Sequence, residues 1–416
     1  MRSRSSHGGR GHAALAAIGI GTVLAVAGCG GGGGEQPAAS GTGAGASASS
    51  KAAVKVGIVY EQTGLLASYG KEYKQGFDAG LAYATKGTGA VNGHKIDVIV
   101  RDSAGDPAKA VSVTKELVGQ GVKIIAGPAN SAVAVQLAPL AEQNQILFIS
   151  GPAATDALTG MNKYTFRSGR ETYQDVRTAA SIVGDISGKK VLVFAQDYEF
   201  GQANATAVKA VLGAGGATVD SLLVPISAND FTPYAQQIKQ RKPDLLFVAW
   251  AGDTTSAMWN ALDQQGVFAS TKVVTGLGDS ASFAAYGTAT SKIQFLSHYF
   301  AGAPDNDVNK QLVDLVTKAG GTPDLFTPDG FVAAQMIVHE IEQADGDNVD
   351  TMIKALEGWS FQGPKGPETV RAEDHALLQP MFVATLTGSG SSFAPKLVKT
   401  VPADQVAPPV KPFGQH

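Results

Sequence analysis

The fold is decided by a stretch that begins with Val54-Lys55-Val56-Gly57-Ile58-Val59-Tyr60, continues through an amphipathic segment at 71–85 and reaches a second β-rich run at 95–100. The first run is apolar almost throughout, whereas a strand with one solvated face would alternate with polar residues. Such continuous runs are typical of strands in a parallel sheet that helices cover on both faces. The stretch therefore predicts an α/β fold.

The same alternation continues along the chain in two series. The first series predicts further strands at 122–126 and 146–150 and helices at 107–119 and 131–143, with Asp106-Pro107 as an N-cap followed by proline. After 164–167 the rhythm restarts, with strands at 190–195, 221–224, 245–250 and 272–275 and helices at 172–186, 201–213, 232–241 and 255–265. One sheet for both series would need about ten strands, so we expect two α/β domains with a boundary near residue 170. Beyond residue 300 we expect helices at 309–319 and 329–344, a helix–strand segment at 349–386, and a disordered tail at 393–416.

The N-terminus has the pattern of a bacterial lipoprotein signal. Three arginines precede a 16-residue apolar run at 13–28, which is too short for an ordinary membrane span of about 20 residues. The run ends at Cys29, the single cysteine of the chain, in a setting that resembles a lipobox. We expect cleavage after residue 28, acylation of Cys29 and a flexible Gly/Ala/Ser-rich tether over 29–52. An ordinary signal peptide with a chance cysteine, or an uncleaved anchor, is the alternative.

Composition and motifs argue against several classes of function. The chain has 416 residues, 44% of them hydrophobic, and a net charge of −3 without the basic excess of a nucleic-acid binder. Residues 64–71 miss the P-loop pattern, because five residues separate the two glycines where four are required. A nucleophile elbow and a zincin motif are both absent, and His94 and His298 are interpreted as surface or structural residues. We therefore expect no catalytic residues, no metal and no cofactor.

Eight short motifs carry a family resemblance. In chain order they are 54–58, 63–70, 91–96, 106–111, 127–131 (Gly-Pro-Ala-Asn-Ser), 152–155 (Pro-Ala-Ala-Thr), 166–167 and 197–201 (Asp-Tyr-Glu-Phe-Gly). Together they resemble the leucine/isoleucine/valine-type solute-binding proteins of ABC importers, over residues 54–386.

The resemblance implies a type I periplasmic-binding fold, in which two lobes, each a parallel-type sheet flanked by helices, are joined by three hinge crossings. The first lobe would comprise 53–170 and 300–378, and the second 171–299 and 379–392. It also implies a small amino acid or related carboxylate as ligand and an ABC permease/ATPase complex as partner, while the resemblance to a lipobox implies a lipid-anchored protein at the outer face of the cytoplasmic membrane. A ligand-sensing receptor module, or an exported α/β enzyme, remains the alternative.

Candidate ligand-binding residues follow the ends of predicted strands, where ligands bind in open parallel sheets. Ser131, with its neighbour Asn130, follows the strand at 122–126, while Ala153 and Thr155 follow the strand at 146–150. In the resembling family the positions of Ser131, Ala153 and Thr155 bind an α-carboxylate, whereas plain helix capping by Ser131 and Thr155 is the alternative.

The remaining candidates would form a wall and a charged end. The positions of Tyr69, Phe200 and Trp250 imply an aromatic wall, although Phe200 lacks the tyrosine hydroxyl that the family often has there. Arg170 departs from the leucine binders and could clamp a carboxylate or pair with Glu171. Either Glu171 or Asp279 could meet a ligand ammonium, and Asp279 could equally be an exposed turn residue.

Overall fold

The computed structural model describes residues 51–389 and 392–414. The expected signal peptide at 1–28, Cys29 and the tether as far as residue 50 lie outside the described residues. The described residues form two large sheets and one small one.

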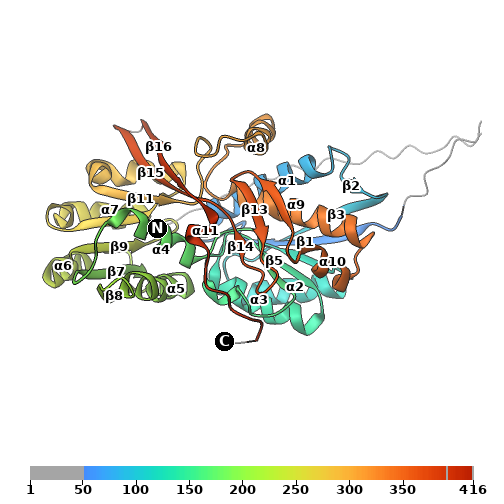
Figure 1. Cartoon of the computed structure of the whole chain (residues 1–416), viewed down its shortest axis with the longest axis horizontal. Helices are drawn as coiled ribbons and strands as arrows, with labels where there is room; N and C mark the ends of the chain where they lie inside the picture. The colour runs from blue at the N-terminus through green and yellow to red at the C-terminus, as the bar shows by residue number, and fades with distance from the viewer. Residues whose placement is uncertain (1–50, 390–391, 415–416) are drawn as a thin grey trace, which may run out of the picture. The chain divides into compact units, whose positions relative to one another are not determined.

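The first sheet has the order β2-β3-β1-β4-β5-β6, and Figure 1 shows it at the right of the view. Its strands are β1 (Val54–Tyr60), β2 (Ala90–Val91), β3 (His94–Asp102), β4 (Ile124–Ala126), β5 (Leu147–Ser150) and β6 (Thr165–Arg167). All neighbouring pairs are parallel except β2 with β3, which form a short antiparallel hairpin. The parallel sheet predicted from residues 54–100 is therefore confirmed.

Helices from two separate parts of the chain surround this sheet. They are α1 (Ala67–Ala84), α2 (Pro107–Gly119), α3 (Ser131–Asn144), the short η1 (Asp156–Leu158), and, beyond residue 300, α8 (Asp307–Lys318), α9 (Thr327–Ala344) and α10 (Val349–Leu356). Two glycines let α1 and α9 pack closely, because a Cβ on Gly76 would lie 1.8 Å from the Thr327 carbonyl oxygen and one on Gly330 would lie 1.9 Å from that of Tyr73. Asp106 caps α2 as predicted, since its carboxylate accepts the amide of Ala108 at 2.7 Å. We call this sheet and its helices the first lobe.

The second sheet has seven strands in the order β16-β15-β11-β10-β9-β7-β8, at the left of Figure 1. They are β7 (Lys190–Gln196), β8 (Thr218–Val224), β9 (Leu245–Ala249), β10 (Lys272–Gly276), β11 (Ile293–Ser297), β15 (Met381–Ser389) and β16 (Ser392–Val401). Strands β7 to β11 are parallel, whereas β15 joins β11 antiparallel and pairs with β16 as a hairpin.

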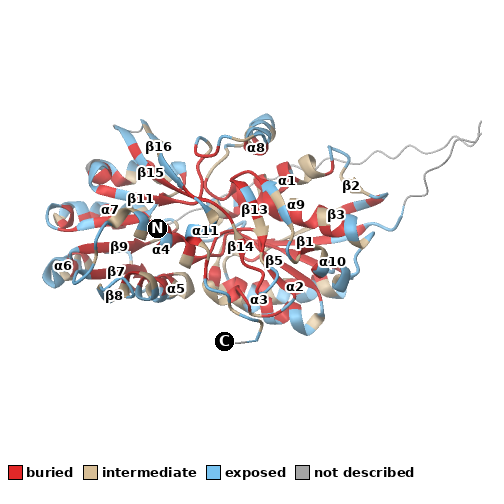
Figure 2. Ribbon diagram, in the orientation of Figure 1, coloured by how far each residue is buried: buried red, intermediate tan, exposed pale blue. Residues whose placement is uncertain are grey.

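The second sheet is buried on both faces. Leu192 and Phe194 pack into one apolar cluster, while the alternating Val191 and Val193 pack into another. The helical segments around this sheet are α4 (Thr172–Val183), α5 (Glu199–Val208), η2 (Lys209–Gly213), α6 (Thr232–Arg241), α7 (Thr255–Gln264), η3 (Val267–Ala269), η4 (Ser280–Lys292) and α11 (Ala403–Val406). Figure 2 shows buried residues along the central strands of both sheets. We call this sheet and its helices the second lobe.

The chain passes between the lobes after β6, after β11 and again before β15. The last passage follows a small antiparallel sheet of β12 (Ser360–Gly363), β13 (Gly366–Val370) and β14 (Leu377–Leu378). The expectation of a disordered tail at 393–416 is wrong for its described part. Residues 392–401 form β16, which pairs with β15 along its whole length, and residues 403–406 form α11.

Candidate functional site

A cavity of about 80 Å³ lies between the two lobes, which suits a compact solute. The first lobe contributes Leu66, Tyr69, Ala129, Pro152, Ala154, Leu325 and Phe326; the second lobe contributes Asp175, Tyr198, Phe200, Asn204, residues 247–251, residues 275–278 and Leu296; Arg170 and His298 lie in the segments that pass between the lobes. Many of these residues lie at or just beyond the carboxyl ends of parallel strands, as Trp250 does for β9 and His298 for β11. The parallel topology therefore brings these loops together at the cavity.

The lobes touch one another around the cavity. The Thr155 hydroxyl of the first lobe donates a hydrogen bond to the Glu199 carboxylate of the second lobe at 2.6 Å. The Ser280 amide of the second lobe donates to the Asp324 carboxylate at 2.9 Å. The structure is therefore a closed arrangement of the lobes.

Arg170 is the only cationic side chain among the described residues that line the cavity. Its NH1 donates to the Pro152 carbonyl at 2.6 Å, and its guanidinium lies over the Phe326 ring at 5.6 Å from the centroid. Arg170 pairs with Asp175 rather than with Glu171, with 3.3 Å between Nε of Arg170 and Oδ2 of Asp175. By geometric criteria this Nε has no hydrogen-bond partner within the described residues. These contacts fix the guanidinium in place at the cavity wall.

Asp175 and His298 complete a polar corner beside Arg170. Burial raises the pKa of the Asp175 carboxyl, and the charge of Arg170 opposes that rise. Burial, together with the positive charges of Arg170 and Lys365, lowers the pKa of His298 well below its ordinary value, so the imidazole is neutral. Oδ1 of Asp175 and Nε2 of His298 have no hydrogen-bond partner in the described part of the chain. The corner therefore holds, beside Arg170, two buried polar atoms without a partner among the described residues.

Aromatic rings form much of the rest of the wall, and the candidate residues Tyr69, Phe200 and Trp250 are among them. The Trp250 indole packs on Phe194 and Phe231, with ring centroids 5.1 and 5.2 Å away, and its Nε1 donates to the Thr254 hydroxyl at 3.0 Å. Tyr69 meets Phe326 edge to face at 4.6 Å. These contacts hold the rings in place before any ligand arrives.

The expected carboxylate cradle does not line the cavity in this arrangement. The Ser131 hydroxyl accepts the Thr155 amide at 3.3 Å, and the Thr155 hydroxyl is engaged with Glu199 and caps η1. Asn130 caps α3 by accepting the Ala132 amide at 2.8 Å, and the Ala153 carbonyl accepts NH2 of Arg167 at 2.8 Å. These four residues are committed to the first lobe and to its contact with the second.

The two acids considered for a ligand ammonium also lie off the cavity wall. Glu171 caps α4, accepts the Thr159 hydroxyl, and is buried deeply enough that its pKa is raised to about 7. Asp279 caps η4 by accepting the Ser282 amide at 3.2 Å, and burial raises its pKa. Asp279 is 7% exposed, so it is not an exposed turn residue.

Sequence reasoning missed Asp175, Tyr198, His298 and Phe326. His298 directly follows the strand at 293–297, but that strand was not predicted from the sequence, so the strand-end rule that selected Trp250 could not be applied to it. Phe326 precedes a helix rather than following a strand, so the rule could not have found it.

The described residues contain no group of three or more His, Cys, Asp or Glu placed to hold a metal ion. Within the same part of the chain, no helix combines the length and apolar character that crossing a bilayer demands.

Comparison with known proteins is consistent across sequence and structure. A model of the periplasmic binding protein family matches residues 53–391. The Leu/Ile/Val-binding protein homolog 6 of Brucella abortus is 28% identical over 341 residues, covering 79% of this chain and 86% of that protein. A solved ABC-type branched-chain amino acid transporter protein from Rhodopseudomonas palustris is 31% identical with a TM-score of 0.72, covering 86% of this chain and 99% of that one. A solute-binding protein of an ABC transporter from the same species, solved with p-hydroxybenzoic acid, is 26% identical with a TM-score of 0.78, covering 85% and 98% of the two chains.

Proposed function

Since this chain belongs to the periplasmic binding protein family, we propose that it captures a small carboxylate between its lobes and delivers it to an ABC importer. The observation that carries the proposal is the position of Arg170, the single cationic side chain among the described lining residues. The matched relatives are named as binding proteins, which favours a role without catalysis.

The electrostatics of the cavity favour an anion. A guanidinium recognises a carboxylate through parallel N–H donors, and such charge-assisted hydrogen bonds are stronger than neutral ones. Asp175 compensates the charge of Arg170 only in part, because burial raises the pKa of that carboxyl and so disfavours its charged form. Arg170 therefore remains available to a ligand carboxylate.

The rest of the wall favours an apolar body on that carboxylate. Tyr69, Phe200, Trp250 and Phe326 offer ring faces and edges on which an aromatic ring or a branched aliphatic group can pack. Of the acids considered for an ammonium group, Glu171 and Asp279 do not line the cavity. Asp175 is the one acid among the described lining residues and is already paired with Arg170, so we favour an aromatic or branched carboxylate over an α-amino acid.

Export and anchoring complete the proposal. Acyl chains on Cys29 would hold the protein at the outer face of the cytoplasmic membrane, and the 29–52 tether would let the lobes reach a permease. Cys29→Ser should abolish acyl labelling and leave the protein unprocessed or released. A cleaved, unlabelled mutant that stays on the membrane would contradict the anchor.

Titration calorimetry tests the ligand class. The protein is first unfolded and refolded so that it is free of ligand. Benzoate, 4-hydroxybenzoate, leucine and valine are the probes, with benzamide as an uncharged control. We expect micromolar or tighter binding of at least one carboxylate, about −8 kcal/mol, and none of benzamide. Saturable binding of uncharged or cationic solutes, with no carboxylate bound, would overturn the proposal.

A further inference from the structure

After β16 the described chain returns from the second lobe to the first. This return is a fourth link between the lobes, in addition to the three crossings that the family resemblance implies. We call residues 402–414 the C-terminal strap. The family model ends at residue 391, before the strap begins.

The first half of the strap is fixed to the second lobe. Val406 of α11 is fully buried in an apolar cluster with Met381, Val383 and Val401 of the β15–β16 hairpin. The Arg177 side chain on α4 donates from Nε to the Gln405 carbonyl at 3.3 Å. The strap is therefore anchored before it leaves this lobe.

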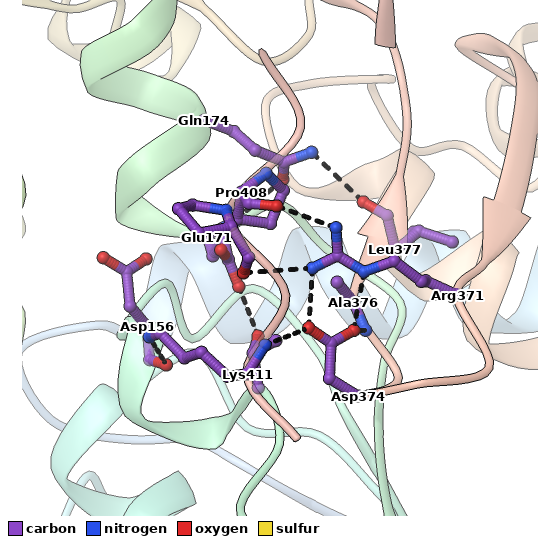
Figure 3. A network of polar contacts seen from close by, with 11 residues as sticks. Asp156, Glu171, Gln174, Arg371, Asp374, Ala376, Leu377, Pro408 and Lys411 are labelled. Carbon is purple, nitrogen blue, oxygen red and sulfur yellow. Dashed lines mark hydrogen bonds and ion pairs between the residues drawn. The ribbon is translucent and has the colours of Figure 1, made fainter. Parts of the chain in front are cut away.

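The second half is fixed to the first lobe through Arg371 and Asp374, between β13 and β14. NH1 of Arg371 donates to the Pro408 carbonyl at 2.7 Å, while its Nε and NH2 bind the Asp374 carboxylate at 2.8 and 2.6 Å. The same carboxylate accepts the Lys411 amide at 3.0 Å, and Figure 3 shows this network. A bidentate arginine pair fixes both partners in one orientation.

The end of the strap lies against the segment that carries η1. The Lys411 ammonium donates to the Asp156 carbonyl at 2.9 Å, and the Gly414 amide donates to the Gly160 carbonyl at 3.2 Å. A Cβ on Gly160 would lie 2.0 Å from the Lys411 carbonyl oxygen, so only glycine permits this approach. The Phe413 ring meets His375 edge to face at 4.7 Å.

The η1 segment in turn holds the first crossing between the lobes. The Asp156 carboxylate accepts the Tyr173 amide at 2.9 Å, and the Thr159 hydroxyl donates to the Glu171 carboxylate. The Lys411 ammonium is close enough to lower the pKa of Glu171, against the larger effect of burial. Arg170, the preceding residue, lines the cavity, so one short segment connects the strap to the candidate ligand contact.

We propose that the strap is a fourth interlobe connection that stabilises the closed arrangement, with Arg371 and Lys411 as positioning residues for Arg170. Contacts with both lobes are satisfied together in the closed arrangement, and rotation about the hinge must break or distort some of them. Interactions made in only one state shift the population toward that state. The effect on affinity rests on the proposed function, whereas the effect on the hinge does not.

Hydrogen exchange on the ligand-free, full-length protein tests the hinge part. Three variants weaken the strap: Arg371→Gln, Lys411→Met and removal of residues 407–416. Each should speed hydrogen exchange of the amides at 168–175 by about tenfold or more. X-ray scattering should show a larger radius of gyration for each variant than for the wild type. Val410→Ser, at an exposed strap position, is the matched control and should change neither. Lys411→Arg should restore the wild-type exchange rates, since it keeps the charge and a donor.

Unchanged exchange at 168–175 in all three variants would overturn the proposal, whatever the ligand is. If the truncated protein does not fold, the two point variants decide the matter. For binding, 4-hydroxybenzoate is the probe, and the variants should raise its Kd by about three- to tenfold. If exchange is faster but the wild type does not bind 4-hydroxybenzoate, the result supports the interlobe role of the strap and counts against that ligand. If exchange is faster but Kd is unchanged, the strap only stabilises the hinge, and the role of Arg371 and Lys411 as positioning residues for Arg170 is overturned.

Discussion

Arg170 and Asp175 form a buried ion pair on the wall of the interlobe cavity, with 3.3 Å between Nε and Oδ2 and only 7% of each side chain exposed. The pair connects the first crossing to the first turn of α4, so it holds the guanidinium at the junction of the two lobes. A bound carboxylate at this point would contact the hinge itself. Ligand capture and lobe closure would then share one residue.

Trp250 should report ligand binding by fluorescence. Its indole lines the cavity and is partly exposed, so a ligand that displaces water from it should change its emission. We expect the signal to disappear in Trp250→Phe and to persist in Trp259→Phe, because Trp259 is buried against Phe268 and Tyr286 away from the cavity. A full fluorescence change in Trp250→Phe would remove Trp250 from the binding wall.

Thr155→Val should weaken ligand binding by removing a contact that only the closed arrangement makes. Loss of the hydrogen bond to the Glu199 carboxylate should cost about 1.5 kcal/mol, or about a tenfold rise in Kd. Ser131→Ala should have a smaller effect, since the Ser131 hydroxyl bonds within the first lobe. Equal and much larger losses in both variants, measured by calorimetry, would instead favour direct carboxylate binding by the pair.

Gly252→Ala should obstruct closure. A Cβ on Gly252 of the second lobe would lie 2.7 Å from the Leu65 carbonyl oxygen of the first lobe, and its φ is +79°. We expect Kd to rise by about tenfold or more, because the closed state is penalised. Gly266→Ala is the matched control, since its φ is +69° and its Cβ would meet open space. If both variants lose equal affinity, backbone strain rather than interlobe contact is the cause.

Glu171 should make stability depend on pH. Burial raises its pKa from 4.5 to about 7 in the folded protein, so between these values the folded state holds a proton that the unfolded state has lost. The stabilisation is complete below about pH 4.5 and is lost as the pH rises to about 7.

Glu171→Gln removes this dependence. Relative to wild type, the variant should gain about 3 kcal/mol of unfolding free energy between about pH 4.5 and pH 8, as followed by urea denaturation at several pH values. The comparison cancels the opposing titration of the buried histidines, which both proteins share. Parallel pH curves for the two proteins would show that Glu171 does not titrate in this range.

The sequence predicted the parallel sheets from local pattern, whereas among the candidate aromatic residues only Trp250 came from a strand end, and Tyr69 and Phe200 came from the family resemblance. Residues 54–60 are apolar except for Lys55, and Trp250 follows β9, so simple rules place both. Ser131 and Thr155 meet the same rule, but their hydroxyls find partners across 24 and 44 residues that no local pattern reveals. The strap was missed because its order comes from Arg371 binding backbone carbonyls of a proline-rich segment, which composition alone marks as disordered.

The proposed carboxylate recognition depends most directly on Arg170, and calorimetric titration of Arg170→Gln tests it. Wild type should bind its tightest carboxylate among the four probes and reject the matching amide. Arg170→Gln should lose about 1.5–3 kcal/mol toward the acid while its binding of the amide stays unchanged. Arg241→Gln, which alters a surface pair with Asp220, should behave as wild type. Undiminished preference of Arg170→Gln for the acid over the amide would contradict the claim that Arg170 binds the ligand carboxylate.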